Sequence, residues 1–142
     1  MNSPSVNRCQ NNYRKKYHIL STLRRACGFL SSSIEAGDTG AIETYTRIIR
    51  ENTEHLYSIE PVIASCSPML PPESAAAGWK EDFEGQFQVF YEEISALHRE
   101  NADALKRFTA RIRRQLSSVQ LLTRGRLLYN GSSLPEYIDI KR

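Results

Sequence analysis

The sequence contains few residues whose type and spacing could support catalysis. Its three histidines, His18, His55 and His98, are far apart, and none has an acidic or cysteine partner at a useful spacing. The adjacent carboxylates Glu92 and Glu93 would point in different directions on a helix, so they do not form an acid–base pair. Neither a phosphate-binding GxxxxGK[ST] loop nor a Glu-x-x-His metal motif is present. We therefore predict that the protein is not an enzyme and has no cofactor or metal.

The cysteines give no sign of a disulfide framework or a zinc site. Cys9, Cys27 and Cys66 are odd in number and widely spaced, without a CxxC pair. We predict three reduced thiols, as is usual in the cytosol. The N-terminal residues lack the apolar core of a signal peptide, and no apolar run reaches the roughly 18 residues of a membrane span. These features predict a cytoplasmic protein without a membrane span.

Length and composition suit one soluble helical domain over residues 1–142. The chain is 40% hydrophobic and 25% charged, with a net charge of +3. Apolar residues recur every three or four positions over residues 12–36 and again over 39–66, which predicts two amphipathic helices. Gly37 supplies a helix stop and Asp38 an N-cap, so the two helices should form an antiparallel hairpin. Pro61 predicts a kink in the second helix or an early end near Glu60.

A third and longest helix is predicted over residues 79–129. The prolines within the 67–78 linker separate it from the hairpin, and the Asn130–Gly131 break leaves 130–142 as a flexible tail. Its apolar stripe repeats close to every 3.5 residues, as in a coiled-coil seam. At 1.5 Å per residue it would be about 75 Å long. Two shorter helices do not cover that length, so we expect either a bend or an apolar face left for a partner. The predicted fold class is all-α, with the hairpin packed on this helix.

The second half of the third helix is strongly basic. No acidic residue occurs between Ala104 and Pro135, whereas seven basic ones do: Lys106, Arg107, Arg111, Arg113, Arg114, Arg124 and Arg126. A basic stripe of this kind can contact nucleic acid, acidic residues of the same chain or an acidic protein. Single-strand binding would also need aromatic residues on the polar face, and they are absent.

Two stretches resemble the FlgN/FliT-type flagellar export chaperones. SIEAGDTGAIETYTRIIRENTEHLYSIEP is similar to the helix–Gly-Asp–helix hairpin of that family, and RIRRQLSSVQLLTRGRLLYNGSSLPEYIDIKR to the basic, amphipathic ending of some members. The resemblance covers most of the chain in outline. Pro61 within the second helix and the heavy basic run depart from the family's pattern.

The resemblance implies a cytosolic chaperone. Such proteins bind the amphipathic terminal helix of a hook-associated or filament-cap subunit, prevent its premature assembly and deliver it to the export apparatus. By helix-in-groove recognition, the family pattern places the client contacts at Phe108, Ile112, Leu116, Val119, Leu122, Leu127, Leu128 and Tyr129.

Two alternatives remain open from the residues themselves. The same apolar side chains would also suit a homodimer or a self-associating structural coiled coil. The basic run would also suit a helical nucleic-acid-binding protein, although we do not expect nucleic acid as the partner.

Overall fold

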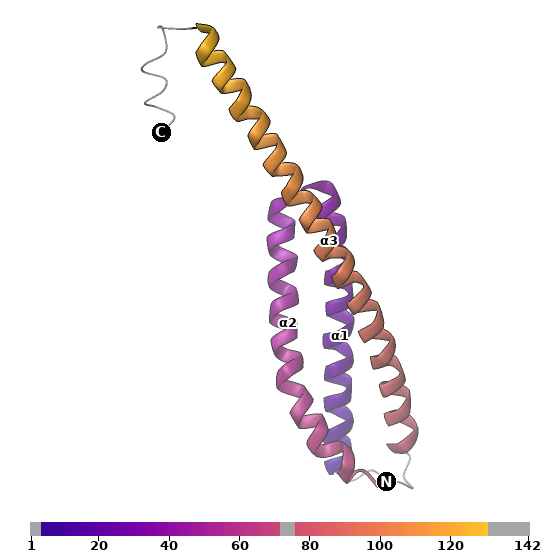
Figure 1. Ribbon diagram of the computed structural model, residues 1–142. Helices are drawn as coiled ribbons and strands as arrows, with labels where there is room; N and C mark the ends of the chain where they lie inside the picture. Colours follow the sequence, from indigo (N-terminus) through magenta and orange to yellow (C-terminus); the bar gives the residue numbers. More distant parts are fainter. Residues whose placement is uncertain (1–3, 72–75, 131–142) are drawn as a thin grey trace. The chain divides into compact units, whose positions relative to one another are not determined.

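The computed structural model describes the backbone of residues 4–71 and 76–130, and the side chains of 4–71 and 78–126. It contains three helices, α1 (Pro4–Ala36), α2 (Thr39–Cys66) and α3 (Ala76–Asn130), and a short 3₁₀ turn, η1 (Ser67–Met69) (Figure 1). No strand occurs among these residues. The predicted all-α hairpin packed on a long third helix is therefore confirmed. The predicted tail falls mostly outside the described residues.

The turn between α1 and α2 has the local chemistry that the sequence predicts. Gly37 has a φ of 68°, a conformation that residues with a Cβ rarely adopt. Its amide donates to Ile34 O at 3.1 Å, and the Asp38 amide donates to Ser33 O at 3.0 Å, which closes α1. The Asp38 carboxylate then accepts a hydrogen bond from the Ala41 amide at 3.1 Å and begins α2.

The predicted boundaries hold best for α2, which extends over Thr39–Cys66 as expected. The early end near Glu60 is wrong, because α2 continues through Pro61. α1 begins at Pro4 rather than Asn12, and α3 at Ala76 rather than Trp79. Proline fits the first turn of a helix, where its missing N–H has no intrahelical acceptor, so the sequence could have indicated the start at Pro4.

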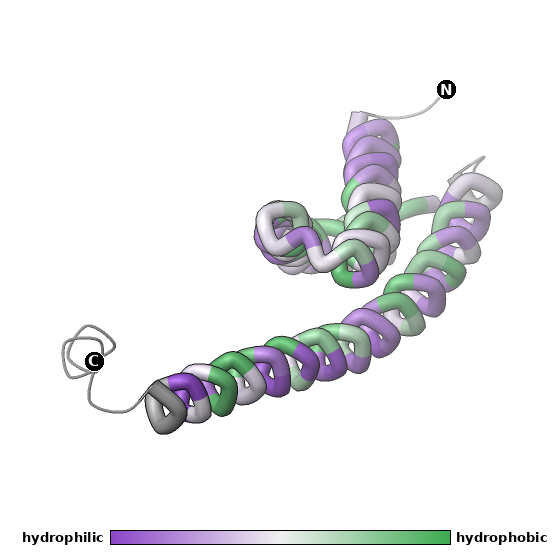
Figure 2. Tube along the Cα trace, turned by 90° about the horizontal axis from the view of Figure 1, so that it is seen from above, coloured by the Kyte–Doolittle hydropathy of each residue, from purple (hydrophilic) through white to green (hydrophobic). Residues whose placement is uncertain are grey.

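Internal contacts divide the chain into two units, Met1–Ala104 and Leu105–Arg142, with the boundary inside α3. The first unit contains the core. Figure 2 shows hydrophobic residues on all three of its helices, and also along α3 beyond the boundary.

Aromatic rings form much of the core of the first unit. Tyr13 of α1 is 1% exposed. Its ring lies 5.1 Å from that of Trp79 and 5.9 Å from that of Phe87, both on α3. Its hydroxyl donates a hydrogen bond to Ser67 Oγ at 3.0 Å. Tyr17 adds an edge-on contact with Phe90 at 5.2 Å. These rings fill the space between α1 and α3, where small side chains would leave voids.

A buried charge joins the three helices. Lys16 of α1 is 7% exposed. Its ammonium lies 2.9 Å from Glu60 Oε1 of α2, and the same oxygen accepts a hydrogen bond from the Tyr91 hydroxyl of α3 at 2.6 Å. The ammonium also lies over the Phe87 ring, 4.7 Å from its centroid. The carboxylate thus satisfies a cation that would otherwise be costly to bury.

The prediction of three reduced thiols is wrong for two of them. Cys9 of α1 and Cys66 at the end of α2 form a disulfide across 57 residues. Cys27 is free and buried. The antiparallel hairpin brings the start of α1 beside the end of α2, which spacing along the chain alone does not reveal. Because disulfides are uncommon in cytosolic proteins, the cytoplasmic location stays a prediction.

Reducing the disulfide should destabilise the protein. Closing a loop of this length restricts the unfolded chain by an amount worth about 4 kcal/mol in the loop-entropy estimate. We expect dithiothreitol to lower the urea midpoint of the intact protein, and Cys66→Ser to lower it similarly. The variant serves as the control, because reductant should not shift its own midpoint. Identical curves for the intact protein with and without reductant would contradict the disulfide.

Glu60 should contribute to acid sensitivity. Burial alone would raise the pKa of Glu60, but hydrogen bonds from Tyr91 and Lys16 outweigh it and hold the pKa below its ordinary value of 4.5. The stabilisation is therefore present above about pH 4.5 and lost as pH falls through the folded-state pKa. Glu60→Gln should cost about 1–2 kcal/mol at pH 7, a hydrogen-bonded charge reduced by partial solvent screening. Urea unfolding between pH 3 and 7 measures both effects.

A matched control for Glu60→Gln is Glu54→Gln, at an exposed position of the same helix. Glu54→Gln should leave unfolding at pH 7 within about 0.5 kcal/mol of the intact protein. If the two variants lose equal stability, the Lys16–Glu60 ion pair does not hold the helices together.

Candidate functional site

The second unit presents an apolar stripe on α3. Of the predicted contact residues, Ile112, Leu116, Val119 and Leu122 are exposed, and Phe108 is half-buried. Their steps of three and four residues keep them on one face of the helix. The side chains of Leu127, Leu128 and Tyr129, also predicted, lie outside the described ones. The structure therefore leaves a row of large apolar side chains in contact with solvent.

A further exposed leucine lies off this stripe. Leu121 is 65% exposed, compared with 57% for Leu116. The two are five positions apart in the sequence, which places them about 140° apart around the helix axis. Leu121 was not among the predicted contacts, and its position makes it a natural comparison for them.

Exposed basic side chains accompany the stripe. All seven between Lys106 and Arg126 are exposed, and none forms a salt bridge with another described residue. The Arg111 guanidinium lies over the Phe108 ring, 5.4 Å from its centroid. By helical spacing, Arg113 lies on one side of the stripe, about 60° around the axis from Leu116, and Arg111 lies on the other, about 60° from Phe108. The surface is apolar along its centre and positive at its edges.

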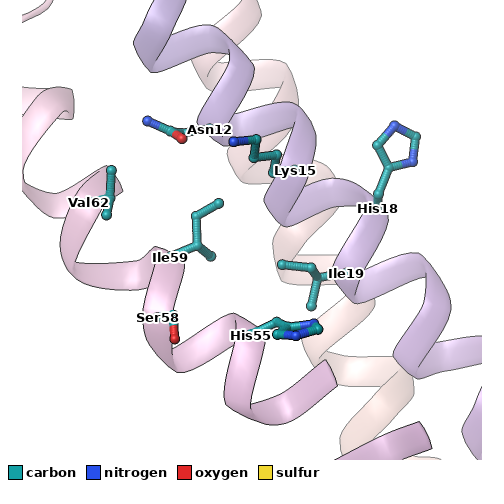
Figure 3. A pocket seen from close by; sticks show the side chains of 8 residues that line it. All are labelled: Asn12, Lys15, His18, Ile19, His55, Ser58, Ile59 and Val62. Carbon is teal, nitrogen blue, oxygen red and sulfur yellow. The ribbon is translucent and has the colours of Figure 1, made fainter. Parts of the chain in front are cut away.

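The sequence did not predict a cavity of about 460 Å³ between α1 and α2. Its lining residues are Asn12, Lys15, His18, Ile19, His55, Ser58, Ile59 and Val62. In Figure 3, Ile19 and Ile59 point into the space between the helices, and Lys15 reaches over it from α1. Periodicity could have suggested this face, because Asn12, Lys15 and Ile19 repeat at helical spacing. Because Asn12 and Lys15 are polar and Ile19 is apolar, the three residues do not form an apolar stripe that the sequence would have revealed.

The described side chains do not assemble an evident reactive centre. His18 and His55 line the same cavity, although the sequence had separated them, and the His18 ring points away from its middle (Figure 3). Within the described residues, no three His, Cys, Asp or Glu side chains are grouped as metal ligands. Burial raises the pKa of the Cys27 thiol and so favours its protonated, less nucleophilic form. No described helix is both long and apolar enough to span a membrane.

Comparison with protein-family models, with curated proteins and with solved structures found no match for this chain. The resemblance to flagellar export chaperones therefore stays a prediction. A function has to be inferred from the surfaces described above.

The stripe on α3 should matter little for folding, because its side chains are already in solvent. Leu116→Asp should change the free energy of unfolding by less than about 1 kcal/mol. Phe87→Ala, at a position only 4% exposed, should cost about 3–5 kcal/mol. Urea unfolding of both variants measures the difference. Equal losses would mean that Leu116 is buried in solution.

Proposed function

We propose that the protein is a chaperone that binds the amphipathic terminal helix of a flagellar structural subunit. It would keep that helix from assembling prematurely in the cytoplasm and deliver the subunit to the export apparatus. The flagellar part of this proposal comes from the sequence resemblance. The helix-binding part is supported by the exposed stripe on α3.

The exposure of Ile112, Leu116, Val119 and Leu122 is the observation that carries the proposal. Contiguous apolar surface is uncommon on a protein unless something binds it. Residues three and four apart on one helix are the usual anchors for a second amphipathic helix. A client helix would lay its own apolar residues along this stripe, and burial of each leucine-sized side chain would contribute about 1.5–3 kcal/mol.

Charge makes a second copy of the chain a poor occupant of this stripe. Two copies that pair through residues 105–126 would bring two rows of positive side chains together, in either orientation, because the segment has no acid. Packed helices have their axes about 8–10 Å apart, which is close to the Debye length of about 8 Å at physiological salt, so the repulsion would be only partly screened. A client with acidic flanks avoids this cost.

The client should be captured through the stripe. The intact protein would be used to capture partners from the native cytosol, with mass spectrometry for identification. We expect one flagellar structural subunit, lost both with Leu116→Asp and on truncation after Gly125. Leu121→Asp is the matched control, because it puts the same charge on the other side of the same helix and should retain the subunit.

Two other outcomes have defined meanings. If the protein captures only itself and sediments as a concentration-dependent oligomer that Leu116→Asp disrupts, it is a self-associating structural protein. If it instead captures nucleic acid, with affinity that falls steeply as salt rises, the basic side chains are the site. Either result would overturn the chaperone proposal.

A further inference from the structure

Two cavities lie in succession along one face of the α1–α2 hairpin. The first is the 460 Å³ cavity of Figure 3. The second has a volume of about 210 Å³ and is lined by Thr22, Arg25, Ala26, Phe29, Tyr45 and Ile48. None of the α3 residues whose side chains the structure describes lines either one. We call this face of the first unit the hairpin groove.

The groove has the spacing of a helix-binding surface. On α1 its lining residues include positions 12, 15, 19, 22, 26 and 29, whose steps alternate between three and four. On α2 the lining residues follow the opposite direction, from Val62 to Tyr45, as an antiparallel hairpin requires. Seventeen residues at 1.5 Å each give the groove a length of about 25 Å, which matches roughly five turns of a partner helix.

Its floor is apolar and open. Ile59 is largely buried, whereas Val62 is 46% exposed and Phe29 is 53% exposed. The Phe29 ring stacks on the Tyr45 ring of α2 at 5.3 Å, which holds both side chains at the end of the groove. A side chain inserted between α1 and α2 would cover this surface and displace water from it.

Charge in the groove indicates the kind of partner. Lys15 and Arg25 line the two cavities, and no carboxylate of the described side chains does. α1 carries six basic residues and one acidic residue, Glu35, at its far end; two of the basic ones, Lys16 and Arg24, pair with Glu60 and Glu93 instead of facing the groove. Glu51 of α2 falls near the same face by helical spacing, and its carboxylate lies 4.0 Å from the Arg47 guanidinium. The lining therefore favours an occupant with negative flanks.

We propose that the hairpin groove binds a second amphipathic helix, about 17 residues long, with an apolar face and acidic flanks. Its apolar side chains would rest on Ile19, Ile59 and Val62, and its carboxylates would face Lys15 and Arg25. The groove is a different surface from the stripe on α3, so its occupation does not require a client there. It gives the protein two binding surfaces, one on each unit.

The test uses the full-length chain carrying Leu116→Asp and Val119→Asp, which disable the stripe on α3. The probe is a fluorescent 18-residue peptide with leucines at helical spacing, flanking glutamates and alanine elsewhere. Anisotropy should show binding to this background protein. Adding Val62→Asp should weaken it at least tenfold, and Lys15→Glu should weaken it in the same direction. Val89→Asp is the matched control, because Val89 is 52% exposed on α3 outside the groove.

Each outcome decides something different. A peptide with lysines in place of the glutamates should bind at least tenfold more weakly. Equal binding of the two peptides would overturn the charge argument and with it the proposed acidic partner.

The groove itself is tested by the variants. Loss of all peptide binding in the Leu116→Asp/Val119→Asp background, or equal effects of Val62→Asp and Val89→Asp, would overturn the groove proposal and leave the proposal for the α3 stripe intact. Circular dichroism of each variant would confirm that it is folded, so that lost binding reflects the groove. If the intact protein captures no flagellar subunit while the peptide still binds the groove, the chaperone proposal alone is rejected.

Discussion

The packing of aromatic rings around Tyr13 is the contact on which the first unit depends. One ring on α1 meets three rings of α3, those of Trp79, Phe83 and Phe87, and its hydroxyl reaches the turn after α2. Because these side chains are large, they let α3 pack against α1 without close approach of the two backbones. Small residues could not fill that space. These ring contacts fix where the start of α3 lies against α1. The polar contacts of Lys16 and Asn101 depend on that position.

Asn101 shows how that placement is made specific. Its side chain is buried and donates to the Cys27 carbonyl of α1 at 2.9 Å. Its Oδ1 is buried without a hydrogen-bond partner among the described residues. At another register of the two helices the NH2 group would lose its partner as well, at a further cost. Together with the ion pair of Lys16 and Glu60, it limits how α3 slides along the hairpin.

The basic residues of the chain have two physical roles that residue type alone does not separate. Lys16 is buried beside a carboxylate and aromatic rings, where it contributes to structure. The arginines between positions 107 and 126 are in solvent without a described acidic partner, so their charge is available to another molecule. The same contrast holds for apolar residues: Phe87 is buried against α1, whereas Leu116 is exposed.

The sequence by itself determined the three helices, the hairpin turn at Gly37 and Asp38, and most of the stripe on α3. These depend on residues within a few positions of one another, through periodicity and capping. Only the tertiary structure decided the Cys9–Cys66 disulfide, the Lys16–Glu60 pair and the hairpin groove. Each joins residues of different helices that are far apart along the chain, and such pairs form only once the register of the helices is set by side-chain packing.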